Sequence, residues 1–531
     1  MRTVLIGLDG ATFSILDPLM EEGVMPFLRR LVARGTRAEL LSTPNPLTPP
    51  AWTSLATGRT PGNHGIFDFL KPYETEEGIF LKLLSSRDVQ CDTLWTLASR
   101  YGKRVILLNF PLTNPPPAIS GFVVPGFVSY RHLRRATYPP GFYQRLQALL
   151  GLNTRDLALD LDYEKKGIQG LPPTEYAEWI RFHIRRESLW GTLLRHLMTQ
   201  EAWDLAAVVF DGPDKLQHLA WRFLDPQCFP AQPSPWEQEI RTLCLEYFRQ
   251  LDALLATLCA LAGPEARIFV ASDHGFGPTW DIFYLNVWLQ QHGYLAWGAA
   301  GAPCDEEEGL LAMRMRTQYE LFDWQHTVAY ALTPSSNGVY IRVAQRPGQA
   351  GIAPEAYAAF RQRLIAELLA FTDPASGEPV VKRVLTREEA FAGRYMHEAP
   401  DLTLVLRDHG FISILNADAP LKRRREPKGM HRPEGILIAA GPGIPQGAVV
   451  PPLAIVDLFP ALLYSLDLAI PADIDAQFPQ ALFEPAWLRA APPRVSDAAL
   501  PLSSSPEAST VLSDEEEAAM VARLKALGYL E

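Results

Sequence analysis

The stretch Val4-Leu-Ile-Gly-Leu-Asp9-Gly10 indicates how this chain folds. A short, continuous run of aliphatic residues ends in an aspartate with glycines on either side, which is typical of a buried strand running into a turn. Five further runs have the same character and are bounded by Gly, Pro or Asp: Val105–Asn109, Leu205–Phe210, Arg267–Ser272, Leu402–Leu406 and Gly435–Ala439. We expect all six to be strands, most of them covered by helices on both faces.

Helical patterns lie between these runs, with apolar residues at helical spacing in 174–198, 241–261 and 354–371. The alternation predicts an α/β protein with a doubly wound, mostly parallel sheet flanked by helices. We expect a core of residues 1–295 and 396–485, with a helical insertion at about 128–200, and an inserted cap subdomain at 296–395. A Pro/Ser linker at 491–510 and a C-terminal docking helix at 513–531 complete the expected organisation.

Composition excludes several classes of protein. Hydrophobic residues make up 47% of the 531 residues, which excludes global disorder. The net charge of −11 argues against coating of a nucleic-acid polymer. Five cysteines without a C-x-x-C pair give neither a disulfide framework nor a cysteine-based zinc site. Without a targeting segment or a membrane-spanning run, we expect a soluble cytoplasmic protein that binds no membrane; a homo-oligomer stays open.

Polar residues gather in four segments at the carboxyl ends of predicted strands, the edge where open α/β sheets bind ligands. Asp9 ends the first, Thr48-Pro-Pro-Ala-Trp52 opens a helix in the second, Asp214 and His218 share a helix face in the third, and Asp273-His274 ends the fourth. Each has a structural alternative as well. A turn aspartate, a helix cap and an acidic helix start explain the first three without any ligand.

The interpretation of two further residues depends on the four segments above. His431 precedes a predicted strand, in a loop where a lone histidine is usually structural. Asp211 is expected to cap the helix that carries Asp214 rather than to bind metal. The basic run 422–425 either attracts an anionic substrate or is simply solvated.

Together these segments supply three aspartates, three histidines and a threonine. Mixed carboxylate and imidazole ligands favour zinc or manganese over calcium. Two such ions about 4 Å apart can clamp the attacking and leaving oxygens of a phosphoryl transfer. A threonine hydroxyl is a poor nucleophile at neutral pH, but a bound dication lowers its pKa.

The order GLDG, T-P-P-A-W-x-x-x-x-T-G, D-x-x-x-H, S-D-H-G and a late G-x-H resembles the alkaline phosphatase superfamily, and most closely its type I phosphodiesterase/nucleotide pyrophosphatase branch. The resemblance covers roughly residues 1–290 and 395–480. It implies a phosphoric ester hydrolase with two divalent metal ions, zinc or alternatively manganese, and a small phosphorylated substrate.

The resemblance also implies a role for each residue. Thr48 corresponds to the nucleophile that becomes covalently phosphorylated. One ion is expected at Asp9, Thr48, Asp273 and His274, and the other at Asp214, His218 and His431. Sulfatases carry a C/S-x-P-S-R setting that is absent here, and threonine in place of serine favours a phosphodiesterase.

One position departs from the family pattern. Nucleotide pyrophosphatases hold a phosphate oxygen with an asparagine, and Phe69 stands at the matching position. Helix amides, Arg59 or Lys215 are the candidate substitutes. The alternatives are a phosphomutase or phosphotransferase on the same scaffold, and a non-catalytic protein that binds a phosphorylated ligand.

Overall fold

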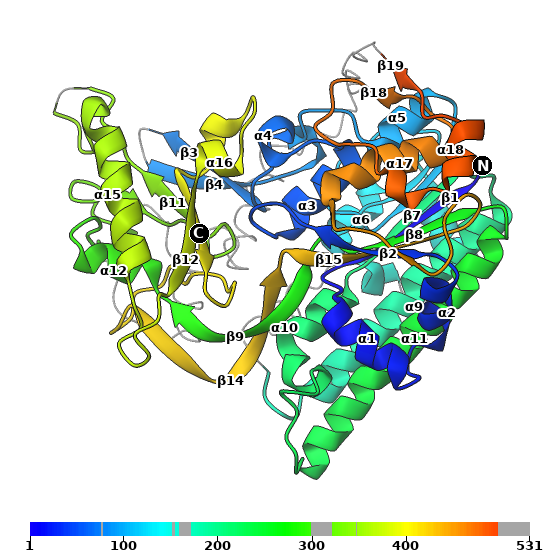
Figure 1. Ribbon diagram of the computed structural model, residues 1–531, viewed down its shortest axis with the longest axis horizontal. Helices are drawn as coiled ribbons and strands as arrows, with labels where there is room; N and C mark the ends of the chain where they lie inside the picture. The colour runs from blue at the N-terminus through cyan, green and yellow to red at the C-terminus, as the bar shows by residue number, and fades with distance from the viewer. Residues whose placement is uncertain (76–77, 151–153, 159–170, 299–320, 347, 497–531) are drawn as a thin grey trace. The chain divides into compact units, whose positions relative to one another are not determined.

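The computed structural model describes residues 1–75, 78–150, 154–158, 171–298, 321–346 and 348–496 (Figure 1). The chain forms two compact units. One contains Met1–Ile66, Ser85–Gly277 and the described chain from His431 onward, and the other contains Phe67–Leu84 and Pro278–Met430. The predicted limits of the cap and of the helical insertion stay predictions. The linker beyond residue 496 and the helix expected at 513–531 lie outside the described residues.

A nine-stranded sheet forms the centre of the first unit. Its order is β16-β2-β15-β8-β1-β7-β5-β6, and β17 also pairs with β2. Neighbours from β8 to β6 are parallel, whereas β15 is antiparallel to β8 and β2. The predicted mostly parallel α/β fold is confirmed. The strands are β1 Thr3–Leu8, β2 Thr36–Leu41, β5 Val105–Leu108, β6 Gly121–Val124, β7 Leu205–Phe210, β8 Arg267–Ala271, β15 Glu434–Ala440, β16 Ala448–Val449 and β17 Leu453–Ala454.

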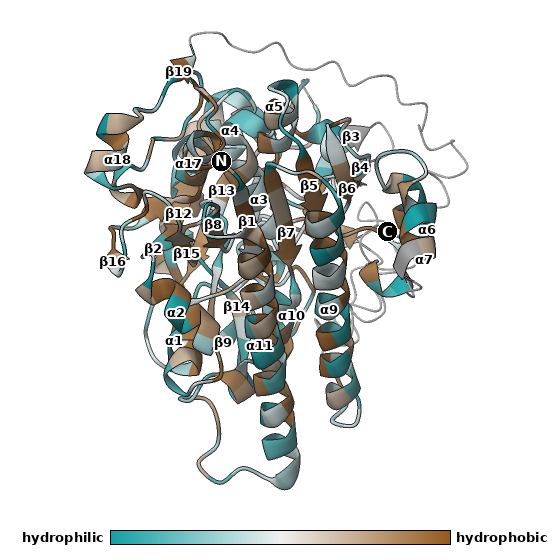
Figure 2. Cartoon of the chain, turned by 90° about the vertical axis from the view of Figure 1, so that its right-hand side faces the viewer, coloured by the Kyte–Doolittle hydropathy of each residue, from teal (hydrophilic) through white to brown (hydrophobic). Residues whose placement is uncertain are grey.

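The central strand β1 is buried on both faces. Val4, Ile6 and Leu8 belong to one hydrophobic core, and Leu5 belongs to the other. This two-sided burial explains why the apolar run is continuous rather than alternating. Figure 2 shows β1, β5 and β7 as hydrophobic along their lengths.

Helices cover both faces of this sheet (Figure 1). Side chains of α1, α2, α6, α7, α9, α10 and α11 pack in one core, and those of α3, α5 and α17 pack in the other. Two of the three predicted helical stretches are α9 and α11. The helices are α1 Phe13–Glu21, α2 Pro26–Ala33, α3 Thr48–Thr57, α4 Pro61–His64, α5 Leu94–Arg100, α6 Tyr130–Ala136, α7 Phe142–Leu150, α9 Tyr176–Gln200, α10 Gly212–Leu224, α11 Pro235–Ala262, α17 Leu458–Ser465 and α18 Pro485–Ala490.

The second unit has its own core around a four-stranded sheet of order β10-β11-β13-β12. The predicted strand Leu402–Leu406 is β13, and it belongs to this antiparallel sheet rather than to the nine-stranded one. The third predicted helix is α15. The elements are β3 Leu70–Thr75, β4 Gly78–Leu83, β10 Ala329–Tyr330, β11 Gly338–Ile341, β12 Val381–Thr386, α12 Leu285–Gln291, α15 Tyr357–Ala370 and α16 Arg387–Ala390.

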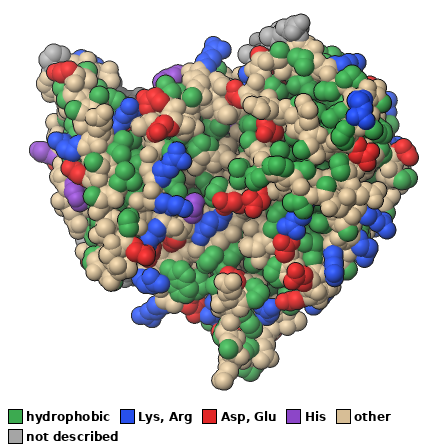
Figure 3. All heavy atoms as spheres, in the orientation of Figure 1, with side chains coloured by type: hydrophobic (Ala, Val, Ile, Leu, Met, Phe, Trp, Pro, Cys, Tyr) green, Lys and Arg blue, Asp and Glu red, His purple; other side chains and the backbone are tan. Residues whose placement is uncertain are grey.

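Three two-stranded sheets complete the description, and one of them is the antiparallel pair of β3 and β4. Strands β9, Gly275–Phe283, and β14, Leu421–Arg432, pair with each other, as do β18, Ile470–Pro471, and β19, Val495–Ser496. The basic run 422–425 is therefore part of a strand rather than a loop. On the face that Figure 3 shows, the coloured basic and acidic side chains are interspersed.

Candidate active site

The carboxyl ends of three adjacent strands bring the polar residues together. Strand β1 lies between β7 and β8 and is parallel to both. Asp9 follows β1, Asp273 and His274 follow β8, and Asp214 lies in the first turn of α10, just after β7. Since parallel strands end at one edge of the sheet, these side chains converge although they are far apart in sequence.

Two expected positions are corrected by the structure. Thr48 is the first residue of α3 and not its cap, because Leu47 occupies the N-cap position; the Thr48 hydroxyl makes no capping bond. His431 is the second-last residue of β14, so it lies in a strand rather than in a loop. Both side chains are buried.

A first cluster consists of Asp9, Asp273 and His274, all at most 1% exposed. His274 Nε2 is 3.6 Å from Asp9 Oδ1 and 3.3 Å from Asp273 Oδ2. Thr48 Oγ1 is 3.5 Å from the same nitrogen. The threonine hydroxyl therefore faces the atoms of this cluster, as its proposed chemistry requires.

A second cluster consists of Asp214, His218 and His431. Asp214 Oδ1 is 3.4 Å from His218 Nε2 and 3.2 Å from His431 Nε2. The two imidazole nitrogens are 3.0 Å apart. At this distance one ring can donate a hydrogen bond to the other, or both nitrogens can bind the same cation.

The two clusters adjoin each other. His274 Nε2 lies 4.0 Å from Asp214 Oδ1, and the rings of His274 and His431 stack with centroids 3.6 Å apart. The structure thus brings all seven predicted residues into one group, in which every member but the partly exposed His218 is buried.

Backbone carbonyls fix the orientation of two of the imidazoles. His274 Nδ1 lies 3.1 Å from the Gly275 carbonyl, and His431 Nδ1 lies 2.8 Å from the Pro46 carbonyl. A carbonyl only accepts hydrogen bonds, so we assign the proton of each ring to Nδ1. The Nε2 lone pair of each ring then points into the clusters, which is the tautomer that a metal-binding histidine needs.

Burial and mutual repulsion shift the pKa values of these groups. Burial, and then the nearby charges of Asp273 and Asp214, raise the pKa of Asp9 well above its usual range. Burial likewise raises the pKa of Asp273 and lowers that of His274. Burial alone would raise the pKa of Asp214 too, but His218 and Lys215 hold it well below its ordinary value. The burial of three carboxylates beside the neutral His274 and His431 favours the binding of positive charge at this site.

The donor set fits divalent cations. One carboxylate oxygen each of Asp9, Asp214 and Asp273 is buried without a hydrogen-bond partner, and such atoms are costly to bury unless something binds them. Each cluster offers three ligand atoms within 4.8 Å of one another. Carboxylate oxygens with imidazole nitrogens suit zinc or manganese.

Residues that the sequence did not single out support the first cluster. Trp52 Nε1 donates to Asp9 Oδ2 at 3.3 Å, and the Gly10 amide donates to Asp273 Oδ1 at 3.1 Å. Trp52 stands in the quoted T-P-P-A-W segment, four residues after Thr48 and thus on the same face of α3. This four-residue spacing could have predicted that Trp52 lies on the same side of the helix as Thr48.

Asp211 occupies the N-cap position of α10, as predicted, but its side chain does not cap the helix. Asp211 precedes the helix but makes no capping bond, because its carboxylate pairs instead with the buried guanidinium of Arg186. The first amide of the helix, at Gly212, donates to Glu187 Oε1 at 2.6 Å. Because Arg186 and Glu187 come from α9, no local pattern around Asp211 reveals this arrangement.

The structure also distinguishes between the candidate phosphate-binding groups. Arg59 is engaged by Asp473 through both the carboxylate and the backbone carbonyl. Pro49 and Pro50 carry no amide hydrogen, so the start of α3 offers few donors. Lys215, by contrast, has Nζ 3.5 Å from Asp214 Oδ2 and a side chain that is 17% exposed. It is the candidate cation that adjoins the clusters.

The mostly parallel α/β fold is that of the alkaline phosphatase superfamily, and the match to a known family supports a phosphoester hydrolase. The sequence profile of the type I phosphodiesterase / nucleotide pyrophosphatase family matches residues 3–434. The chain belongs to that family. In the part of the chain that the structure describes, no helix combines the length and apolarity needed to cross a membrane.

Solved structures share the fold at low sequence identity. Phosphonoacetate hydrolase from Sinorhizobium meliloti 1021, in complex with phosphonoformate, is 18% identical with a TM-score of 0.52, covering 88% of this chain and 95% of that one. A murine ectonucleotide pyrophosphatase / phosphodiesterase in complex with AMP is 12% identical with a TM-score of 0.49, covering 88% and 96%. No curated protein matches the sequence significantly.

Proposed function

We propose that the protein hydrolyses phosphodiesters through a covalent phosphothreonine at Thr48, with two divalent cations bound by the two clusters. The observation that carries the proposal is the position of Thr48 Oγ1, 3.5 Å from His274 Nε2 in the buried group where both clusters adjoin. Because the Thr48 hydroxyl makes no capping bond, a capping role does not explain its position beside His274.

The first cluster and Thr48 would hold one cation, and the second cluster would hold the other. When bound, the cations lower the pKa of the threonine hydroxyl and of water and neutralise charge on the phosphate. Zinc is the proposed metal, because the set of three carboxylates and three imidazoles favours it over calcium.

The reaction runs in two balanced displacements. Thr48 Oγ1 forms a bond to phosphorus while the bond from phosphorus to one ester oxygen breaks, and that oxygen leaves as an alcohol after taking up a proton. Water then attacks phosphorus, the bond to Thr48 breaks, and a phosphate monoester leaves. The threonine regains its proton and the chain is unchanged.

Lys215 is proposed to bind a non-bridging phosphate oxygen. Its ammonium group lies beside Asp214, and the aromatic ring of Phe127 is 5.8 Å away. Phe69 offers no side-chain donor, and Arg59 is held by Asp473. Lys215 is therefore the group best placed to bind the phosphate oxygen in place of the family's asparagine.

The decisive experiment compares wild type with Thr48→Ala and Thr48→Ser on an aryl phosphodiester, with zinc and after chelation. We expect Thr48→Ala to lose turnover by at least about a thousandfold, since the nucleophile is removed, and Thr48→Ser to keep part of it. Acid quenching followed by mass spectrometry of the peptide with residue 48 should detect a phosphoryl adduct in wild type and none in Thr48→Ala. Undiminished activity in Thr48→Ala, or in the chelated protein, would refute the proposal.

A further inference from the structure

Gln217 connects the two chain segments that carry the metal-ligand clusters. It lies in the second turn of α10 and is 1% exposed. Its amide nitrogen donates to the Gly10 carbonyl at 2.8 Å and to the Pro213 carbonyl at 3.0 Å. Gly10 directly follows Asp9 of the first cluster, and Pro213 directly precedes Asp214 of the second. One NH2 group therefore binds both segments.

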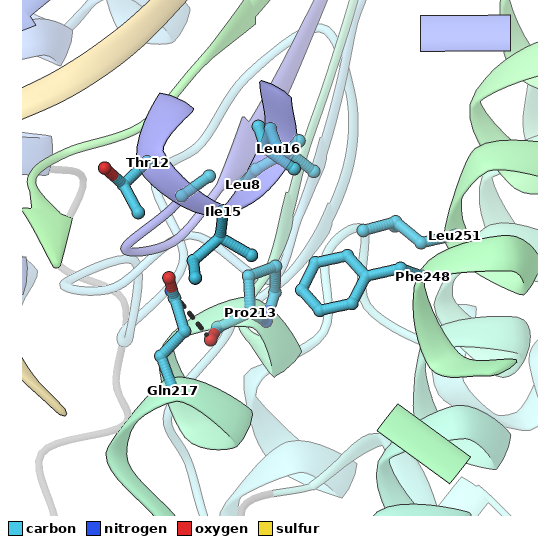
Figure 4. A pocket seen from close by; sticks show the side chains of 9 residues that line it. Leu8, Thr12, Ile15, Leu16, Pro213, Gln217, Phe248 and Leu251 are labelled. Carbon is cyan, nitrogen blue, oxygen red and sulfur yellow. Dashed lines mark hydrogen bonds between the residues drawn. The ribbon is translucent and has the colours of Figure 1, made fainter. Parts of the chain in front are cut away.

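The surroundings of Gln217 are otherwise those of an apolar side chain. Figure 4 shows it next to Pro213, with Ile15 and Phe248 among the apolar side chains that line the same small pocket. Its Oε1 is buried without a hydrogen-bond partner. The orientation of the amide follows from its partners, since two carbonyl oxygens require a donor. An unsatisfied oxygen in this place is unfavourable, so packing alone would favour methionine.

The contact continues through Gly10 into the first cluster. The Gly10 amide donates to Asp273 Oδ1, while the Gly10 carbonyl accepts from Gln217. Gly10 has a φ of +66°, and a Cβ there would lie 2.7 Å from the Phe276 ring, so only glycine fits. Gly10 thus accepts a hydrogen bond from Gln217 of α10 and donates one to Asp273 at the end of β8, so this one residue links the two elements.

We propose that Gln217 is a positioning residue that sets the separation between the two metal-ligand clusters. The proposal rests on the proposed function, because it requires both clusters to bind a cation. Without the two donated bonds, the Asp9–Gly10 segment loses its tie to α10, while the ligands of the second cluster stay on their own helix and strand. The cations would then still find ligands, but the distance between them would no longer be fixed.

The test compares Gln217→Met, which keeps the volume and removes both donors, with Gln250→Met, the same change at an exposed position of α11. Zinc binding to the metal-free full chain is measured by titration calorimetry, and the manganese form by electron paramagnetic resonance. We expect Gln217→Met to bind one of its two zinc ions about tenfold more weakly and to lose the exchange coupling of paired manganese ions. We also expect kcat to fall more than KM rises, and Gln250→Met to match wild type.

A second variant covers the case in which Gln217→Met folds poorly. Gln217→Asn keeps the amide but is one methylene shorter, so it cannot reach both carbonyls, and it should show the same weakened zinc site. Two wild-type zinc affinities and intact manganese coupling in a folded variant would overturn the proposal. If wild type itself binds fewer than two zinc ions, the proposed function fails instead, and the two failures are thereby distinguished.

Discussion

Replacing Arg186 with methionine should destabilise the first unit severely. Its guanidinium pairs with Asp211, and the side chains are 2% and 1% exposed. Asp211 also accepts a hydrogen bond from Asn109 Nδ2 at 3.3 Å, but this bond is too weak to compensate a buried charge. Removing one partner of a buried ion pair costs about 3–5 kcal/mol, because the other charge is left without compensation. Methionine nearly fills the same volume, so little of the loss should come from a cavity.

The free energy of unfolding can be measured in urea at pH 7 for Arg186→Met and for Arg181→Met, an exposed arginine on the same helix. Arg181→Met should change it by less than about 0.5 kcal/mol. The double variant Arg186→Met/Asp211→Asn should recover much of the loss, since no charge then stays unpaired. A loss below about 1 kcal/mol in Arg186→Met, or no recovery in the double variant, would refute this account of the pair.

The direction of the Asp211 pKa shift predicts how the stability contributed by this pair depends on pH. Burial alone would raise the pKa of Asp211, but Arg186 holds it below its ordinary value of 3.8. A depressed carboxyl pKa adds stability above the unfolded-state value, and this stability is lost as the pH falls through the folded-state value. The difference between wild type and Arg186→Met should therefore be largest near neutral pH and should narrow in acid.

Three further predictions concern neighbouring residues. Burial raises the pKa of Glu187 to about 8 from 4.5, so the folded protein favours the neutral acid. Between these two pH values, the stability of wild type should fall by up to about 1.4 kcal/mol per pH unit. Glu187→Gln should remove this pH dependence in thermal unfolding scans. Trp52→Phe removes a donor to Asp9 and should weaken zinc binding about tenfold in a chelator competition, whereas Trp288→Phe, which removes an unpartnered indole N–H, should not. Lys215→Met should raise KM for a phosphodiester about tenfold in steady-state assays; an unchanged KM would remove Lys215 from the site.

Local pattern was sufficient for several central elements and for the chemical types at the site. Continuous apolar runs identified β1 and β7 because strands covered on both faces need no polar residues, and helical periodicity identified α9 and α11. The ends of those runs located the aspartates and histidines, since side chains at the carboxyl edge of a parallel sheet are where ligands bind. These are properties of short segments, so they can be read without knowing what packs against them.

Tertiary structure decided how those side chains are used. The His431 ring is held by the Pro46 carbonyl, 385 positions away, and this contact fixes which of its nitrogens faces the second cluster. Asp211 binds an arginine of α9 instead of its own helix. The role of Gln217 depends on the Gly10 carbonyl, 207 positions away. Hydrogen bonds between such distant residues form only when the chain has folded, because it is the packing of β1, α9 and α10 that brings their polar atoms within reach.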